Sequence, residues 1–135
     1  MNTFAGAVIP VLLSKIRETP GSIPDDVLYS LYYIFKQTLV QALEILDQSH
    51  VTRLSVTGTP RSCFLVQGKN SHYLTYSHYC SCPSFMYSVI SRLEVPMCKH
   101  QLAAVLAEAM GHVQERPVSE EEFVQFVSSP PPEVA

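Results

Sequence analysis

The chain has 135 residues, a formal net charge of −3, and 47% hydrophobic but only 16% charged residues. This length indicates a single domain. An average soluble domain is roughly 25% charged, so the composition indicates an excess of apolar surface, which is best explained by a protein partner. Because the charge balance is acidic and the chain has no run of Lys or Arg, independent binding to a nucleic-acid backbone is disfavoured.

The sequence shows no sign of export or membrane anchoring. The apolar run over residues 4–13 is too short to span a bilayer, and it lacks the basic start and the cleavage site of a signal peptide. We therefore expect no membrane interaction. Four cysteines in such a chain indicate a reducing compartment, where thiols at paired spacing hold metal more often than they form disulfides.

Residues 1–50 are predicted to be a helical region. Over residues 4–17 the helical spacing is interrupted by Pro10, which predicts a kinked or late-starting helix, and residues 18–22 predict a turn. Residues 25–48 predict one long amphipathic helix with an apolar arc of roughly half its circumference. Part of this arc exceeds what a small domain covers, which predicts a partner-binding face at Tyr29, Tyr33, Ile34 and Val40. A central helix wrapped by its own chain is the alternative.

After residue 50 the apolar period changes from that of a helix to that of a strand. Residues 51–57, 62–67 and 72–78 predict a small antiparallel three-stranded meander, turned by residues 58–61 and 68–71. The meander leads directly into Cys80. The predicted fold class is therefore α+β, with N-terminal helices, the meander and a helical C-terminal part that follows Cys80.

The remaining residues predict three short helices. The first covers residues 84–93, and the second covers residues 99–110 and ends at Gly111. A linker begins at residue 114, and a capping box over residues 119–122 starts the last helix, residues 120–127, before a mobile tail. We expect residues 1–50, 51–113 and 114–135 to form one structural domain.

The residues with metal-binding chemistry are Cys80, Cys82, Cys98 and His100. Positions i and i+2 of a strand share one face, so Cys80 and Cys82 can present both sulfurs to one ion. Cys98 and His100 can close a tetrahedron from the first turn of the following helix. Three thiolates and an imidazole are the donors of a closed structural zinc site. The plainer alternative is three buried thiols and a satisfied histidine.

Other roles for these residues are less well supported. A catalytic zinc needs an open coordination position, and a Cys98–His100 nucleophile pair needs an orienting third group and a cleft, which the sequence does not suggest. We therefore expect a non-enzyme without a small-molecule substrate. Cys63 stands apart and is expected to be a small buried hydrophobe. His78 is the one other histidine placed to support or replace a ligand.

The spacing Cys80-x-Cys82, fifteen residues, then Cys98-x-His100-x-x-Ala103 resembles the SWIM-type zinc finger. In the extended form of that motif an alanine follows the histidine by three residues, and a small Ala103 would let the helix pack closely beside the site. The flanking residues 79–85 and the helical segment 23–35 extend the resemblance to the SWIM-domain-containing subunits of Shu-type complexes.

That resemblance implies a nuclear role in homologous recombination, including meiosis. Such subunits form a heterodimer with a RecA-like recombinase paralogue, and the complex promotes assembly of the recombinase filament on single-stranded DNA, contacted through the partner. No phosphate-binding G-x-x-x-x-G-K-[ST] loop is present, so nucleotide chemistry would belong to the partner. The alternative is direct binding of single-stranded DNA by the finger, with bases stacked on tyrosines and phosphates held by scattered basic residues. The residues concerned are Arg53, Arg61, Lys69, Arg92, Lys99, Tyr73, Tyr76 and Tyr79.

Overall fold

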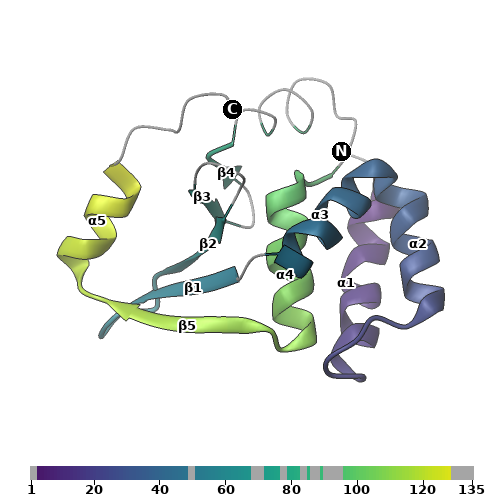
Figure 1. The fold of residues 1–135 in the computed structure, drawn as a ribbon, viewed down its shortest axis with the longest axis horizontal. Helices are drawn as coiled ribbons and strands as arrows, with labels where there is room; N and C mark the ends of the chain where they lie inside the picture. Colours follow the sequence, from purple (N-terminus) through teal and green to yellow (C-terminus); the bar gives the residue numbers. More distant parts are fainter. Residues whose placement is uncertain are drawn as a thin grey trace.

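The computed structural model describes residues 3–48, 51–67, 72–76, 79–82, 85, 89 and 96–128 of the chain. A helical half and a sheet half share one helix, α4 (Lys99–Met110), which stands between them (Figure 1). This arrangement confirms the predicted α+β class. Among the described residues, no helix combines the length and the apolar composition that a membrane span requires.

The helical half begins with α1 (Thr3–Arg17), which continues through Pro10. The expected late start is therefore wrong. Proline inside a helix removes one backbone hydrogen bond and costs about 3 kcal/mol. Ile9, Leu12 and Ile16 lie on the same side of α1 and are all buried, so burial of this face offsets the cost of Pro10.

The single long helix expected over residues 25–48 is instead two helices, α2 (Asp25–Phe35) and α3 (Gln37–Gln48). The break is at Lys36, whose φ of 54° and ψ of −127° lie outside the helical region. Because the chain bends there, α2 packs on α1 while α3 turns to pack on α4. One straight helix could not bury its apolar side against both neighbours.

The sheet is larger than the predicted meander. Strands β1 (Val51–Val56), β2 (Ser62–Gln67) and β3 (His72–Tyr76) form the expected antiparallel set, and β4 (Tyr79–Cys80) adds a short edge. On the opposite side β5 (Val113–Val118) runs parallel to β1, so that the described order is β4-β3-β2-β1-β5. The sheet is therefore mixed, not a three-stranded meander alone.

Strand β5 occupies residues where a linker was expected. Its polar side chains are exposed, which hides the two-residue alternation of a strand from the sequence, and Pro117 is tolerated because β5 lies at a sheet edge. The capping box that follows is confirmed: the Glu122 N–H donates to Ser119 Oγ at 3.1 Å, and the Ser119 N–H donates to Glu122 Oε1 at 3.2 Å. It starts α5 (Glu120–Ser128), which packs Phe123 against the sheet.

Helix α4 is the centre of the fold. Nine of its twelve residues are buried, including polar His100 and Gln101. Ala103 and Leu106 pack with the N-terminal helices, whereas Ala104 and Ala107 pack against β1 and β2. The helix ends at Gly111, in the left-handed conformation that the sequence predicts there. Whatever fixes the start of α4 therefore fixes both halves relative to each other.

Candidate metal centre

The expected ligands come from two places that the fold brings together. Cys80 ends β4, and Cys82 lies two residues beyond it in the bend that leaves the sheet. Cys98 is the N-cap of α4, and His100 is in its first turn. The structure thus joins a sheet edge to the start of the central helix through these four residues, as predicted. The expected strand geometry is wrong for Cys82, because β4 ends at Cys80 and the chain bends there.

The geometry fits a tetrahedral ion. The three sulfurs and an imidazole nitrogen all lie within 4.8 Å of one another. Zinc with Zn–S distances of about 2.3 Å and a Zn–N distance of about 2.0–2.1 Å places its ligand atoms about 3.5–3.8 Å apart. All four residues are at most 4% exposed.

The Nδ1 atom of His100 gives separate support for metal binding. His100 Nδ1 is buried and has no hydrogen-bond partner in the described part of the chain. A buried polar atom without a partner costs about 1–3 kcal/mol. It is therefore rare unless the atom binds an ion or water. Coordination by Nδ1 would remove this cost, so the orphaned nitrogen supports metal binding over the alternative of a satisfied core histidine.

The thiols are arranged so that they hold their protons when no metal is bound. The pKa of Cys80 is raised well above its ordinary value, mainly by hydrogen bonds with Cys82 and Cys98 and to a smaller extent by burial. The bond with Cys80 lowers the pKa of Cys98, but the bond with Cys82, burial and charge repulsion outweigh it and raise that pKa to about 12. Three thiolates cannot share this site without a cation, and a divalent metal ion supplies the required charge.

Gln101 holds the start of α4 and was not predicted from the sequence. The Cys98 N–H donates to Gln101 Oε1 at 3.0 Å, and the Gln101 N–H donates to Cys98 Sγ at 3.5 Å. Gln101 Nε2 donates to the Tyr76 carbonyl at the end of β3, at 3.1 Å. A cysteine three residues before a glutamine is the only sequence signal, because capping boxes normally begin with Ser or Thr.

Two further contacts position the cluster. The Tyr73 ring lies 4.2 Å from the His100 ring, centroid to centroid, and limits how the imidazole can rotate. Ser81 continues the sheet past Cys80, since its N–H donates to the Leu74 carbonyl while its Oγ accepts from the Leu74 N–H, each at 3.1 Å. Phe85 and Val89 pack with the cysteines. The helix expected over residues 84–93 otherwise lies outside the described residues.

The structure places the supporting residues as follows. Ala103 is fully buried, one turn beyond His100, and faces the N-terminal helices. Cys63 is buried as expected, is absent from the ligand cluster, and hydrogen-bonds Tyr76. His78 lies outside the described residues. Of the expected partner-binding residues, Tyr29 and Tyr33 are 78% and 69% exposed, whereas Ile34 and Val40 are half-buried.

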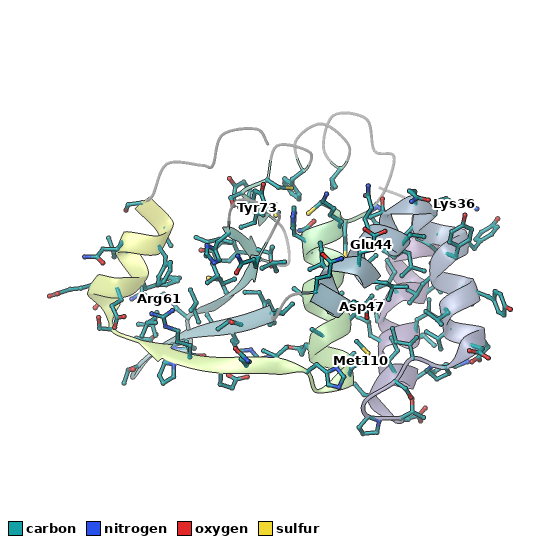
Figure 2. The ribbon with its side chains drawn as sticks, viewed as in Figure 1. Lys36, Glu44, Asp47, Arg61, Tyr73 and Met110 are labelled. Atoms are coloured by element: carbon teal, nitrogen blue, oxygen red, sulfur yellow. The ribbon has the colours of Figure 1, made fainter. Side chains whose placement is uncertain are left out.

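Only some of the residues considered for nucleic-acid binding lie near the site: Lys99 and Tyr79 directly precede His100 and Cys80, whereas Arg53 and Arg61 do not adjoin the ligands. Arg53 and Arg61 bond to glutamates on α4, β5 and α5. Tyr73 is buried against His100, so it cannot stack on a base. Lys69 and Arg92 lie outside the described residues, and Figure 2 shows Arg61 beside α5, away from Tyr73.

No protein-family model matches the chain. It is 37% identical over 136 residues to the zebrafish (Danio rerio) zinc finger SWIM domain-containing protein 7, with 97% of each chain covered. The human protein of that name is 33% identical over 127 residues, with 90% of each chain covered. A homologue from Dictyostelium discoideum is 36% identical over 112 residues, which are 81% of this chain and 72% of that protein.

Proposed function

We propose a function on the premise that this chain belongs to the zinc finger SWIM domain-containing protein 7 family, as the identities to its relatives over most of both chains show. Cys80, Cys82, Cys98 and His100 are accordingly its zinc site. The proposed function is that of a non-catalytic, zinc-stabilised scaffold. It forms a heterodimer with a RecA-like recombinase paralogue in a Shu-type complex, and this complex promotes recombinase filament assembly on single-stranded DNA in the nucleus, in meiosis among other settings.

The observation that carries the scaffold role is the position of the zinc site. Its four protein ligands fill a tetrahedral shell, are buried, and join the edge of the sheet to the start of α4. A catalytic zinc site keeps a coordination position open to substrate or water, which a complete shell of four protein ligands does not. When bound, the metal supplies a cross-link worth about 10–16 kcal/mol in small fingers.

The partner surface is proposed on α2, where Tyr29 and Tyr33 are exposed on the side away from the core. Tyrosine is among the residues that contribute most to protein–protein binding energy. Contact with single-stranded DNA is assigned to the partner, because Arg53 and Arg61, two of the candidates for phosphate contact, are engaged by glutamates.

Co-expression with the RecA-like paralogue of the same organism tests this function. The wild-type chain should co-purify with the paralogue at a ratio near one. Cys82→Ser should lose the complex, while Cys63→Ala should keep it. Tyr29→Ala with Tyr33→Ala should also lose the complex, with Val124→Ala on α5 as the exposed control. Failure of the wild-type pair to co-purify would contradict the proposal.

Binding of single-stranded DNA separates the scaffold from the alternative of a DNA-binding finger. The isolated chain should bind an oligonucleotide weakly at any salt concentration, and the complex should bind it more tightly. Tight binding by the isolated chain, with an affinity that falls steeply with salt, would favour direct contact by the finger.

A further inference from the structure

The outward side of α2 presents one continuous stripe of exposed side chains. At 100° per residue its members lie within about 60° of Tyr29, and the buried Val27 and Leu31 are on the opposite side of the helix. The tyrosines of the stripe are 78%, 49% and 69% exposed, in chain order. The stripe consists of Asp25, Asp26, Tyr29, Tyr32, Tyr33 and Lys36.

Charge is distributed along this stripe with opposite signs at its two ends. Asp25 and Asp26 occupy the first turn of α2, and Lys36 follows its last residue. Asp26 has one exposed cationic neighbour, Lys15, at 3.9 Å. Lys36 Nζ lies 4.7 Å from the centre of the Tyr33 ring and 5.9 Å from that of Tyr32, and within the described ranges it forms no ion pair. Figure 2 shows Lys36 at the outer end of the helical half.

The backbone at Lys36 is strained in a way that glycine would avoid. Its φ of 54° with ψ of −127° is a conformation that side chains disfavour, at a cost of about 1–3 kcal/mol. The ammonium group of Lys36 lies beside the tyrosine rings. Glycine at this position would relieve the strain, but it would remove the positive charge from the end of the stripe. The lysine side chain therefore indicates a role outside the fold.

We propose that two copies of this chain associate through their α2 stripes in antiparallel orientation. Asp26 and Lys36 are each five residues from Leu31. A two-fold axis at the level of Leu31 therefore sets Lys36 of one copy against Asp25 and Asp26 of the other, and packs the tyrosines between them. A parallel arrangement would instead oppose like charges. The same pairing is made twice, once at each end of the interface.

The small area of the stripe places this association among the weak ones. A fully covered aromatic side chain buries about 150–250 Å², so the exposed parts of the three tyrosines offer about 300–500 Å² on each copy. The total of about 600–1,000 Å² is below the range of about 1,200–2,000 Å² for stable interfaces. We therefore expect a weak and transient dimer, because interfaces below this range are of that kind. The proposed recombinase-like partner would compete for the same tyrosines, but the association is a property of the isolated chain.

Sedimentation of the zinc-loaded chain between about 5 µM and 1 mM tests the proposal. The wild type should pass from monomer to dimer. Lys36→Glu and the double variant Asp25→Lys/Asp26→Lys should each weaken self-association at least about tenfold. An equal mixture of the two variants should restore the dimer, because opposite charges then meet at both ends. Val124→Ser, an exposed control on α5, should behave as the wild type.

Lys36→Gly separates a role in the interface from a role in the fold. The glycine variant should have a higher unfolding temperature, because the backbone strain is relieved. It removes the positive charge, whereas Lys36→Glu reverses it, so the dimer should be weakened about threefold instead of tenfold.

A wild type that stays monomeric at about 1 mM would overturn the proposal. So would single variants that dimerise normally, or a mixture that fails to restore the dimer although both variants are folded by circular dichroism. Because no recombinase-like partner is present, these outcomes leave the proposed function untouched.

Discussion

Cys98 and Gln101 bond to each other in both directions at the start of α4. The Cys98 N–H donates to the Gln101 side chain at 3.0 Å, and the Gln101 N–H donates to the Cys98 sulfur at 3.5 Å. The sulfur is thus a helix cap and a zinc ligand at once, and an N–H donor to a ligating thiolate stabilises its negative charge. The bond from Gln101 to the Tyr76 carbonyl extends this arrangement into the sheet.

Replacing Gln101 by alanine should destabilise the zinc-loaded protein. The change removes the acceptor of the buried Cys98 N–H and the donor to the Tyr76 carbonyl, and should lower the free energy of unfolding by about 1–3 kcal/mol. Urea unfolding followed by circular dichroism measures the loss. Gln114→Ala on the exposed edge of β5 is the control, expected within about 0.5 kcal/mol of wild type. Equal losses for the two variants would contradict the role of Gln101.

Zinc binding should release protons. The pKa of Cys80 is raised, and that of Cys98 is raised to about 12, so at neutral pH these thiols are protonated before metal binds. Binding as thiolates expels their protons, so the apparent zinc affinity should rise with pH. The stability that zinc confers should be lost as the pH falls. Calorimetry in two buffers of different ionisation enthalpy should give about two to three protons released near pH 7.5. A value near zero would contradict thiolate coordination.

Arg53 should contribute more to stability than other surface arginines. It bonds Glu108 on α4 and Glu115 on β5, and Glu108 also pairs with Arg17 on α1. A network of this kind stabilises the fold more than an isolated exposed ion pair does. Arg53→Met should therefore lower the free energy of unfolding by about 1 kcal/mol, and by less at high salt. Arg61→Met, which breaks one exposed pair with Glu120, should cost less than about 0.5 kcal/mol. The reverse order of the two losses in thermal unfolding would refute the network.

Pro10→Ala should stabilise the protein. Alanine restores the hydrogen bond that proline removes from the interior of α1 and relieves the clash with the preceding turn, for a gain of about 1–3 kcal/mol. Pro24→Ala is the matched control, because Pro24 precedes α2 and its missing N–H removes no intrahelical bond. An unfolding temperature that is unchanged or lower for Pro10→Ala would show that α1 does not continue through residue 10.

The metal site was predictable because its spacing is a local property. Two residues separated by one position lie close together in the chain, so each ligand pair is a local feature, although β4 ends at Cys80 and Cys82 lies in the following bend rather than on the strand. The meeting of the two pairs depends on the fold. Gly111 and the box from Ser119 to Glu122 were predictable for the same reason, since each acts on its own helix end.

The features that the sequence did not reveal depend on contacts between distant residues. The apolar period passes through Lys36 without interruption, and lysine is not a helix breaker, so the bend appears only when α3 packs on α4. Strand β5 pairs in parallel with β1, more than fifty residues earlier, and its polar side chains give no alternating pattern. Long-range pairing of this kind has no local signal.

The zinc content of the purified chain tests the central claim most directly. Metal analysis by mass spectrometry should give about one zinc per chain for the wild type and for Cys63→Ala, whose thiol lies outside the ligand cluster. Cys82→Ser should give a ratio near zero and lose the cooperative unfolding of the region around α4. A wild-type ratio near zero, or an unchanged ratio in Cys82→Ser, would contradict a zinc site built from Cys80, Cys82, Cys98 and His100.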